Sequence, residues 1–175
     1  MRPRLLLAAA VCLTAVTSVG HAQTKQQLIE DWERQRSNFL AYIDAMPDSA
    51  MGFVPTPGVR DFAQQIVHAV STNLEVSAMA LKGMSTAPFT LDSTQIHQKA
   101  ALREYTDRSY GFLLDALKGA TPSQLLKQAS VYNLPAQSAS RWLTLSYEHA
   151  VWTLGQTIPY LRLNGVTPPA YKQPL

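Results

Sequence analysis

Four long stretches of helical hydrophobic periodicity, separated by clusters of proline and glycine, constrain the fold of this chain more than any other feature. Apolar residues recur at intervals of three and four over residues 25–45, 61–81, 92–118 and 138–163, a spacing that places them along one face of an α-helix. No segment predicts a strand convincingly. Amphipathic helices of this length bury their apolar faces most simply against one another. The sequence therefore predicts an all-α domain built as an antiparallel four-helix bundle.

The first two helices have clear boundary residues. Thr24 with Gln27, and Asp61 with Gln64, have the spacing of a capping box, in which the side chain at the helix start and the one three residues later each accept a backbone N–H. Pro47 ends the first helix because proline cannot continue the backbone hydrogen-bond pattern. We therefore expect these helices to begin at about residues 25 and 62.

The last two helices are delimited less sharply. Asp92 or Ser93 is the expected start of the third helix, which ends before Gly119. The stretch 122–137 is looser and is expected to hold one short helical turn. Pro159 lies inside the fourth helix and removes one backbone donor, which predicts a kink or a loosened final turn.

The N-terminal segment has the composition of an export signal. Two arginines among the first four residues precede an apolar run at 5–13, and the small residues Gly20 and Ala22 are placed for cleavage after the latter. We predict a signal peptide at 1–22 and one domain at 23–175, exported to the periplasm or secreted. An uncleaved signal anchor is the alternative. The mature chain contains no apolar run long enough to span a membrane.

Removing this segment changes what composition implies. The net charge of +3 includes two arginines of the predicted signal, so the mature chain has 13 basic against 12 acidic residues. A net charge of about +1 gives no general attraction to nucleic acid. The single cysteine, Cys12, also lies in the predicted signal. The mature chain can therefore form no disulfide and has no thiolate for catalysis or metal binding.

One face of the last predicted helix carries an unusual line of polar side chains. At 100° per residue, His149 lies at the centre of this face, which is otherwise partly apolar. Its polar members on successive turns are Ser146, His149, Thr153 and Gln156, with Trp142 and Trp152 beside them. Buried polar groups need partners, so this line predicts a pocket between helices. A histidine that only hydrogen-bonds a neighbouring helix is the simpler alternative.

The other two histidines of the mature chain have less informative surroundings. His68 shares its helix face with Thr72 and Glu75, opposite the apolar face, so periodicity alone places it toward solvent. His97 lies among glutamines near the start of the third helix and is expected to be exposed, without a role.

Two segments resemble the exported branch of the DinB-like superfamily. They are FVPTPGVRDFAQQIVH at residues 53–68 and EHAVWTLGQTIPYLRLNGVTPP at residues 148–169. Their order and separation match the family, and the resemblance covers nearly all of the mature chain. It implies a four-helix bundle, in agreement with the periodicity, and a possible homodimer. It does not imply DNA binding.

The resemblance also implies a metal site, which this sequence alters. Family members commonly hold a divalent metal, zinc or nickel, through one histidine on the second helix and a His-x3-His pair on the last. The matching positions here are His68, His149 and Thr153. A threonine hydroxyl is a poor substitute for imidazole, and catalytic zinc usually has three protein ligands. We expect metal to bind weakly or not at all.

Two functions are consistent with these residues. The first is a bundle that binds a small molecule or a partner beside an incomplete metal site, with Ser146, Trp152 and Gln156 lining the pocket. The second is a metal-dependent hydrolase or transferase that holds its metal through His68 and His149. The retained polar line and Thr153 favour the first.

Overall fold

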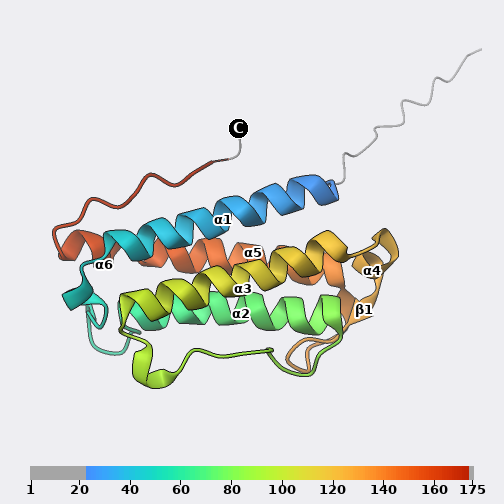
Figure 1. Cartoon of the computed structure of the whole chain (residues 1–175), viewed down its shortest axis with the longest axis horizontal. Coiled ribbons are helices and arrows are strands. Elements are labelled where there is room, and N and C mark those ends of the chain that lie inside the picture. The colour runs from blue at the N-terminus through green and yellow to red at the C-terminus, as the bar shows by residue number, and fades with distance from the viewer. Residues whose placement is uncertain (1–22, 174–175) are drawn as a thin grey trace, which may run out of the picture.

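The structure is a computed structural model that describes residues 23–173, so the predicted signal peptide at 1–22 lies outside the described residues. Four long helices form a bundle (Figure 1): α1 (Lys25–Ala45), α2 (Phe62–Lys82), α3 (Lys99–Gly119) and α5 (Ala139–Gln156). Shorter elements occupy the connections: the 3-10 turns η1 (Asp48–Ala50) and η2 (Ser93–Gln95), the helices α4 (Pro122–Leu126) and α6 (Ile158–Leu163), and the strands β1 (Gln128–Ala129) and β2 (Gln137–Ser138). The predicted four-helix bundle is confirmed.

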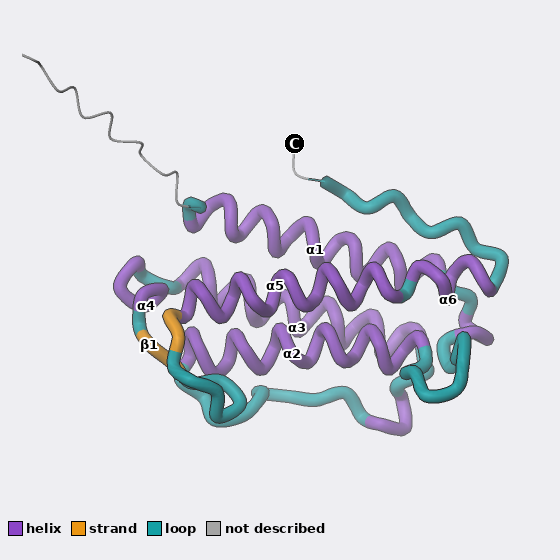
Figure 2. The backbone as a smooth tube through the Cα atoms, turned by 180° about the vertical axis from the view of Figure 1, so that it is seen from behind, coloured by secondary structure: helices purple, strands orange, loops and turns teal. Residues whose placement is uncertain are grey.

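The helices run in two directions, and α2 and α3 are parallel. Asp61 and His97, which precede α2 and α3, are hydrogen-bonded, and Asn73 contacts Tyr110 farther along both helices. The antiparallel arrangement expected of neighbours holds for α2 with α5 and for α1 with α3. Residues 83–98 make the parallel pair possible, since they return along the whole bundle (Figure 2). Such a segment can extend about 50 Å, more than the roughly 30 Å length of α2.

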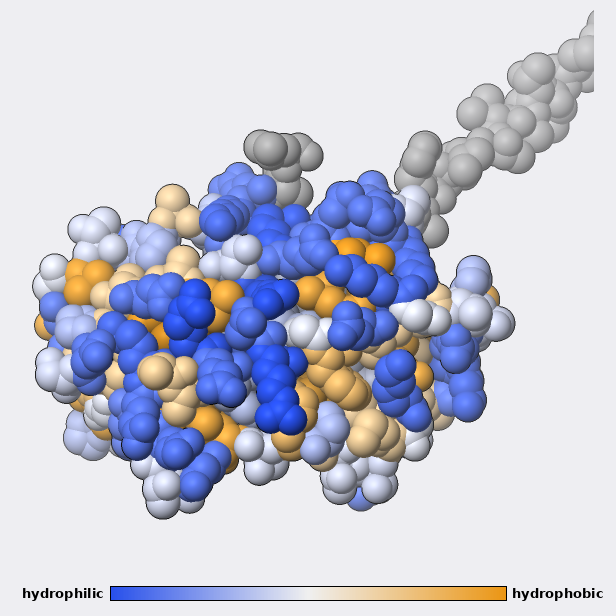
Figure 3. Space-filling model, viewed as in Figure 1, coloured by the Kyte–Doolittle hydropathy of each residue, from blue (hydrophilic) through white to orange (hydrophobic). Residues whose placement is uncertain are grey.

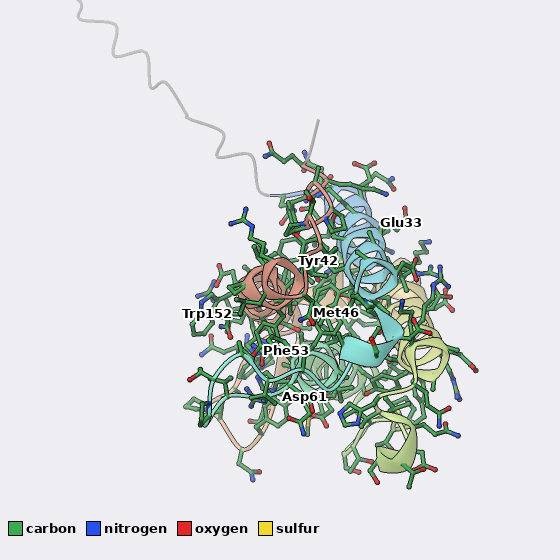
Figure 4. All side chains as sticks on the ribbon, turned by 90° about the vertical axis from the view of Figure 1, so that its left-hand side faces the viewer. Glu33, Tyr42, Met46, Phe53, Asp61 and Trp152 are labelled. Carbon is green, nitrogen blue, oxygen red and sulfur yellow. The ribbon has the colours of Figure 1, made fainter. Side chains whose placement is uncertain are left out.

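The packing partners follow from this order. The helix α2 packs on α3 and α5, and α1 packs chiefly on α3. A view along the bundle shows α1 and α2 at opposite corners, with Met46 between the helices (Figure 4). Apolar side chains from all four helices fill the centre; the largest without exposed surface include Trp32, Phe39, Phe62 and Leu113.

Both predicted capping boxes are present. Thr24 and Asp61 each accept the backbone N–H of the residue three positions later, and Gln27 and Gln64 each bond back to the backbone of the capping residue. Gly83 ends α2 in the left-handed conformation, at φ 65°. Glycine adopts this conformation without the steric penalty of a Cβ atom.

The predicted start of the third helix is wrong. Asp92 begins only the 3-10 turn η2, and α3 begins at Lys99 without a side-chain cap. The Asp92 carboxylate accepts both the backbone N–H and the hydroxyl of Thr94, each at 2.8 Å. These local bonds stabilise a tight turn in place of a first α-helical turn.

The last predicted helix is divided, as Pro159 predicts. The helix α5 ends at Gln156, Thr157 lies between, and α6 continues from Ile158 to Leu163. The short turn expected in 122–137 is α4. The sequence did not predict the two-residue antiparallel pairing of β1 with β2, which closes this connection.

One face of the molecule shows how polar and apolar side chains are distributed on its surface. On the face in Figure 3, hydrophilic side chains surround small, separated apolar areas. Among residues 23–173, no helix combines the length and apolar character needed to cross a membrane.

Candidate functional site

Polar side chains form three successive pairs where α2 packs against α5. The two helices are antiparallel, so each step along α2 matches a step back along α5. The pairs are Gln65–Gln156, His68–His149 and Asn73–Ser146, joined by contacts of 2.5, 3.1 and 2.6 Å. All three α5 residues, Ser146, His149 and Gln156, belong to the polar line that the sequence singled out. The site is therefore a seam of polar side chains along the contact between α2 and α5.

The middle pair brings the two candidate histidines into contact. The Nε2 atoms of His68 and His149 lie 3.1 Å apart, and the rings are nearly perpendicular, with centroids 4.8 Å apart. One Nε2 donates to the other, because two bare nitrogens would repel at this distance. Periodicity alone placed His68 toward solvent. It is instead half-buried, since α5 covers this side of α2.

Thr153 lies beside the pair, at the position that the family resemblance matched to a third imidazole. Its hydroxyl donates to the carbonyl of His149 at 2.7 Å, and Oγ1 lies 3.5 Å from His149 Nε2. The proton of this hydroxyl is therefore used within α5. What Thr153 offers to the space beside the imidazoles is a weak acceptor.

The other ring nitrogen of His149 is in a different environment. Nδ1 is buried and makes no hydrogen bond to any described residue. A buried N–H without an acceptor costs more than a bare ring nitrogen, so we assign the proton to Nε2, which donates to His68. A metal-bound histidine almost always donates its second N–H to an acceptor. His149 lacks that support.

Both imidazoles are held neutral near pH 7. Burial lowers the pKa of His68 and His149 from 6.5, and the nearby guanidinium of Arg60 lowers the pKa of both further. The charged form of His149 adds a third, smaller effect that lowers the pKa of His68. The same positive field opposes a cation bound at these nitrogens.

An open pocket of about 550 Å³ lies at the Gln65–Gln156 end of the seam, about one turn of α2 from His68 and about two turns of α5 from His149. It is lined by Gly58, Val59, Arg60, Gln64, Gln65, Gln156 and Tyr160. The Tyr160 hydroxyl donates to the carbonyl of Arg60 at 2.7 Å, which ties the segment before α2 to α6. Gln156, at the end of α5, is one of the residues that line this pocket.

Two other predicted site residues lie differently. Ser146 is buried, at 3% exposure, and binds Asn73 inside the core rather than lining an open pocket. Trp152 is 70% exposed and points away from the bundle (Figure 4). Trp152 lies 60° from His149 around α5, and this side of the helix faces solvent. The structure does not bring it to the site.

The donor set does not fit a complete metal centre. Within residues 23–173, no group of three or more histidine, cysteine, aspartate or glutamate side chains is placed to hold one ion. Glu75 hydrogen-bonds Tyr132, and His97 hydrogen-bonds Asp61 at 2.9 Å. The sequence predicted no role for His97 and did not predict this contact with Asp61, the capping residue of α2.

Sequence reasoning missed several residues of the site. Asn73 and Gln35 are polar residues on the apolar faces of their helices, and that position was the available signal. Asn73 donates to the Tyr110 hydroxyl, which donates to Gln35, so the seam continues as a buried chain through α2, α3 and α1. Arg60 precedes its helix and has no periodicity to mark it.

Comparison with known proteins gives the family. The DinB superfamily profile matches residues 31–152. Because this match covers most of the chain, the protein belongs to the DinB superfamily. No curated protein matches the chain.

Solved structures share the fold at low sequence identity. A DinB-like protein from Bacillus cereus superposes with a TM-score of 0.71 at 16% identity, covering 86% of this chain and 99% of that one. A DinB-like protein from Bacillus subtilis gives 0.71 at 15% identity, covering 85% and 99%. A mycothiol-dependent maleylpyruvate isomerase gives 0.57 at 12% identity, covering 75% and 60%. These likenesses establish a common bundle and no common chemistry.

Proposed function

We propose that this protein is an exported DinB-like bundle that binds a small molecule at the seam between α2 and α5. His68, His149 and the adjoining pocket form the binding site, and any metal there is held weakly. The basic and apolar composition of residues 1–22 supports export. The observation that carries the proposal is the hydrogen-bonded imidazole pair beside an open, polar pocket.

The imidazole pair is suited to recognition of polar ligands. It is neutral near pH 7, half-buried and fixed by packing, so its hydrogen-bonding groups are already oriented. Polar groups placed beside a concave surface are the usual determinants of small-molecule specificity. A volume of about 550 Å³ suits a ligand of this class.

Small-molecule binding is tested with matched probes on metal-free protein. The probes are propionate and benzoate, their neutral amides, and the corresponding propyl and benzyl amines. Imidazole resonances are followed by ¹H–¹⁵N spectroscopy. We expect at least one charge class to shift the resonances of His68 and His149, with His97 as the internal control. If no probe affects the pair at millimolar concentration, the proposal is wrong.

Weak metal binding is tested by supplying the missing imidazole. Thr153→His is expected to raise zinc affinity at least about 100-fold, beyond what outer-shell contacts contribute. Thr144→His is the matched control, because Thr144 makes the same hydroxyl bond to the carbonyl four residues earlier. Calorimetric titration measures both. Tight binding of one zinc equivalent by the unaltered chain would contradict this part of the proposal.

A metal-dependent hydrolase or transferase is the second candidate. It is favoured by the 3.1 Å between the two Nε2 atoms, because nitrogens bound to one zinc lie about 3.3 Å apart. Elemental analysis of protein purified without metal resin separates the two candidates. Stoichiometric zinc or nickel that is lost in His68→Ala supports the enzyme.

A further inference from the structure

Arg60 supplies the basic charge among the described residues that line the pocket beside the seam. Its guanidinium makes no ion pair or hydrogen bond within residues 23–173, whereas Arg34, Arg36 and Arg103 each pair with an aspartate. Of the described residues that line the pocket, none is acidic.

The nearest carboxylate in sequence, Asp61, is occupied elsewhere. One oxygen accepts the backbone N–H of Gln64 at 2.8 Å, and the other contacts His97 Nε2 at 2.9 Å. The Asp61 side chain is only 8% exposed. It serves the α2 cap and leaves the Arg60 charge available to a ligand.

Neutral donors lie around the same pocket. Gln64 uses its Oε1 to accept the Asp61 backbone N–H, and Gln156 uses its Oε1 to accept from Gln65. In both cases the carboxamide NH₂ makes no hydrogen bond to the described residues. The pocket therefore presents one guanidinium and two carboxamide donors.

We propose that this pocket binds the carboxylate of a small organic acid, with Arg60 as its anchor and Gln156 as a second donor. The remainder of the ligand extends past Gln65 toward His68 and His149. This inference rests on the proposed small-molecule function and names its ligand class. A guanidinium binds a carboxylate through two parallel hydrogen bonds. One cation with neutral amides matches a single negative charge better than it matches a phosphate dianion.

The experiment uses the full mature chain without metal. Benzoate and propionate are titrated against the wild type, Arg60→Gln, Arg60→Lys and Arg141→Gln at constant ionic strength, with benzamide and inorganic phosphate as comparison probes. We expect Arg60→Gln to weaken carboxylate binding at least about tenfold. Arg60→Lys retains the charge but lacks the planar guanidinium, so its carboxylate affinity should lie between those of the wild type and Arg60→Gln. Arg141 lies at the opposite end of α5, and its replacement should change the Kd less than about twofold.

The possible outcomes separate this inference from the proposed function. Equal carboxylate affinity in the wild type and Arg60→Gln would overturn it, as would benzamide binding as tightly as benzoate or phosphate binding more tightly than either acid. If only amides or amines shift His68 and His149, small-molecule binding stands and the carboxylate assignment is wrong. If no probe shifts them, both proposals fail. Circular dichroism and melting temperature confirm that each variant is folded.

Discussion

The two ring nitrogens of His149 have unequal surroundings. Nε2 lies 3.1 Å from His68 Nε2, whereas the buried Nδ1 has no partner among the described residues. Protonating His149 would place a buried N–H at Nδ1 and a charge beside the field of Arg60. The folded protein therefore favours the neutral pair.

This preference makes stability depend on pH. Both pKa values in the folded chain are below 6.5, so the unfolded chain takes up protons first as pH falls. The contribution to stability is full above about pH 6.5 and is lost as the pH falls from there through the folded-state values. Urea unfolding with chelator present should show a steeper loss between pH 6.5 and 5 in the wild type than in His68→Gln/His149→Gln. Equal slopes would contradict the assigned pKa directions.

The contact of His68 with α5 could not be predicted from the identity of the residues on α2 alone. The hydropathy of α2 distinguishes an apolar face from a polar one, and His68 lies on the polar one. Whether another helix covers that face depends on where α5 packs, which is not a local property of α2. The family resemblance paired residues 68 and 149, and periodicity could not.

At the scale of the elements, one buried hydrogen-bonded chain connects all four long helices. Ser146 of α5 donates to Asn73 of α2, which donates to Tyr110 of α3, and Tyr110 donates to Gln35 of α1. Each of the four side chains is at most 3% exposed. Since each bond requires specific positions on two helices, the chain fixes how the helices are placed relative to one another.

Within this hydrogen-bonded chain, replacing Asn73 should lower the free energy of unfolding most. Asn73→Ala removes the acceptor of Ser146 and the donor to Tyr110 and leaves a cavity, so the free energy of unfolding should fall by about 2–4 kcal/mol. Tyr110→Phe should cost less, about 1–2 kcal/mol, because it removes only the hydroxyl. Chemical denaturation of both variants and the double variant measures their coupling. Strict additivity would show that the chain does not act as a unit.

Helix boundaries were predictable where a single side chain determines them. Thr24 and Asp61 accept the N–H groups that their capping boxes predict, and Pro159 interrupts the last helix. Asp92 is also a residue type that caps helices, but its carboxylate accepts from Thr94, two residues later, and so stabilises a 3-10 turn. In the chain that follows, Lys99 contacts Asp48 and His97 contacts Asp61, and neither contact can be predicted from the local sequence.

At the scale of the whole molecule, export gives the clearest test. The full chain, produced in a bacterial host with a secretion pathway, should lose residues 1–22 and be recovered outside the cytoplasm with Gln23 at its N-terminus. Intact mass and N-terminal sequencing measure this. Ala22→Trp, which places a bulky residue at the predicted cleavage site, should retain the segment. Recovery of uncleaved wild type from the cytoplasm would contradict the predicted export.

The crossing connection at 83–98 has a consequence for how the protein acquires its structure. Helices α1 and α2 follow each other in sequence but pack mainly on α3 and α5 rather than on each other. Native contacts therefore join segments far apart along the chain, which gives a higher contact order than an up-and-down bundle of similar size. Because loop closure precedes these contacts, folding should be slower than in such a bundle. During synthesis, α1 and α2 gain their main packing partners only once α3 has emerged from the ribosome.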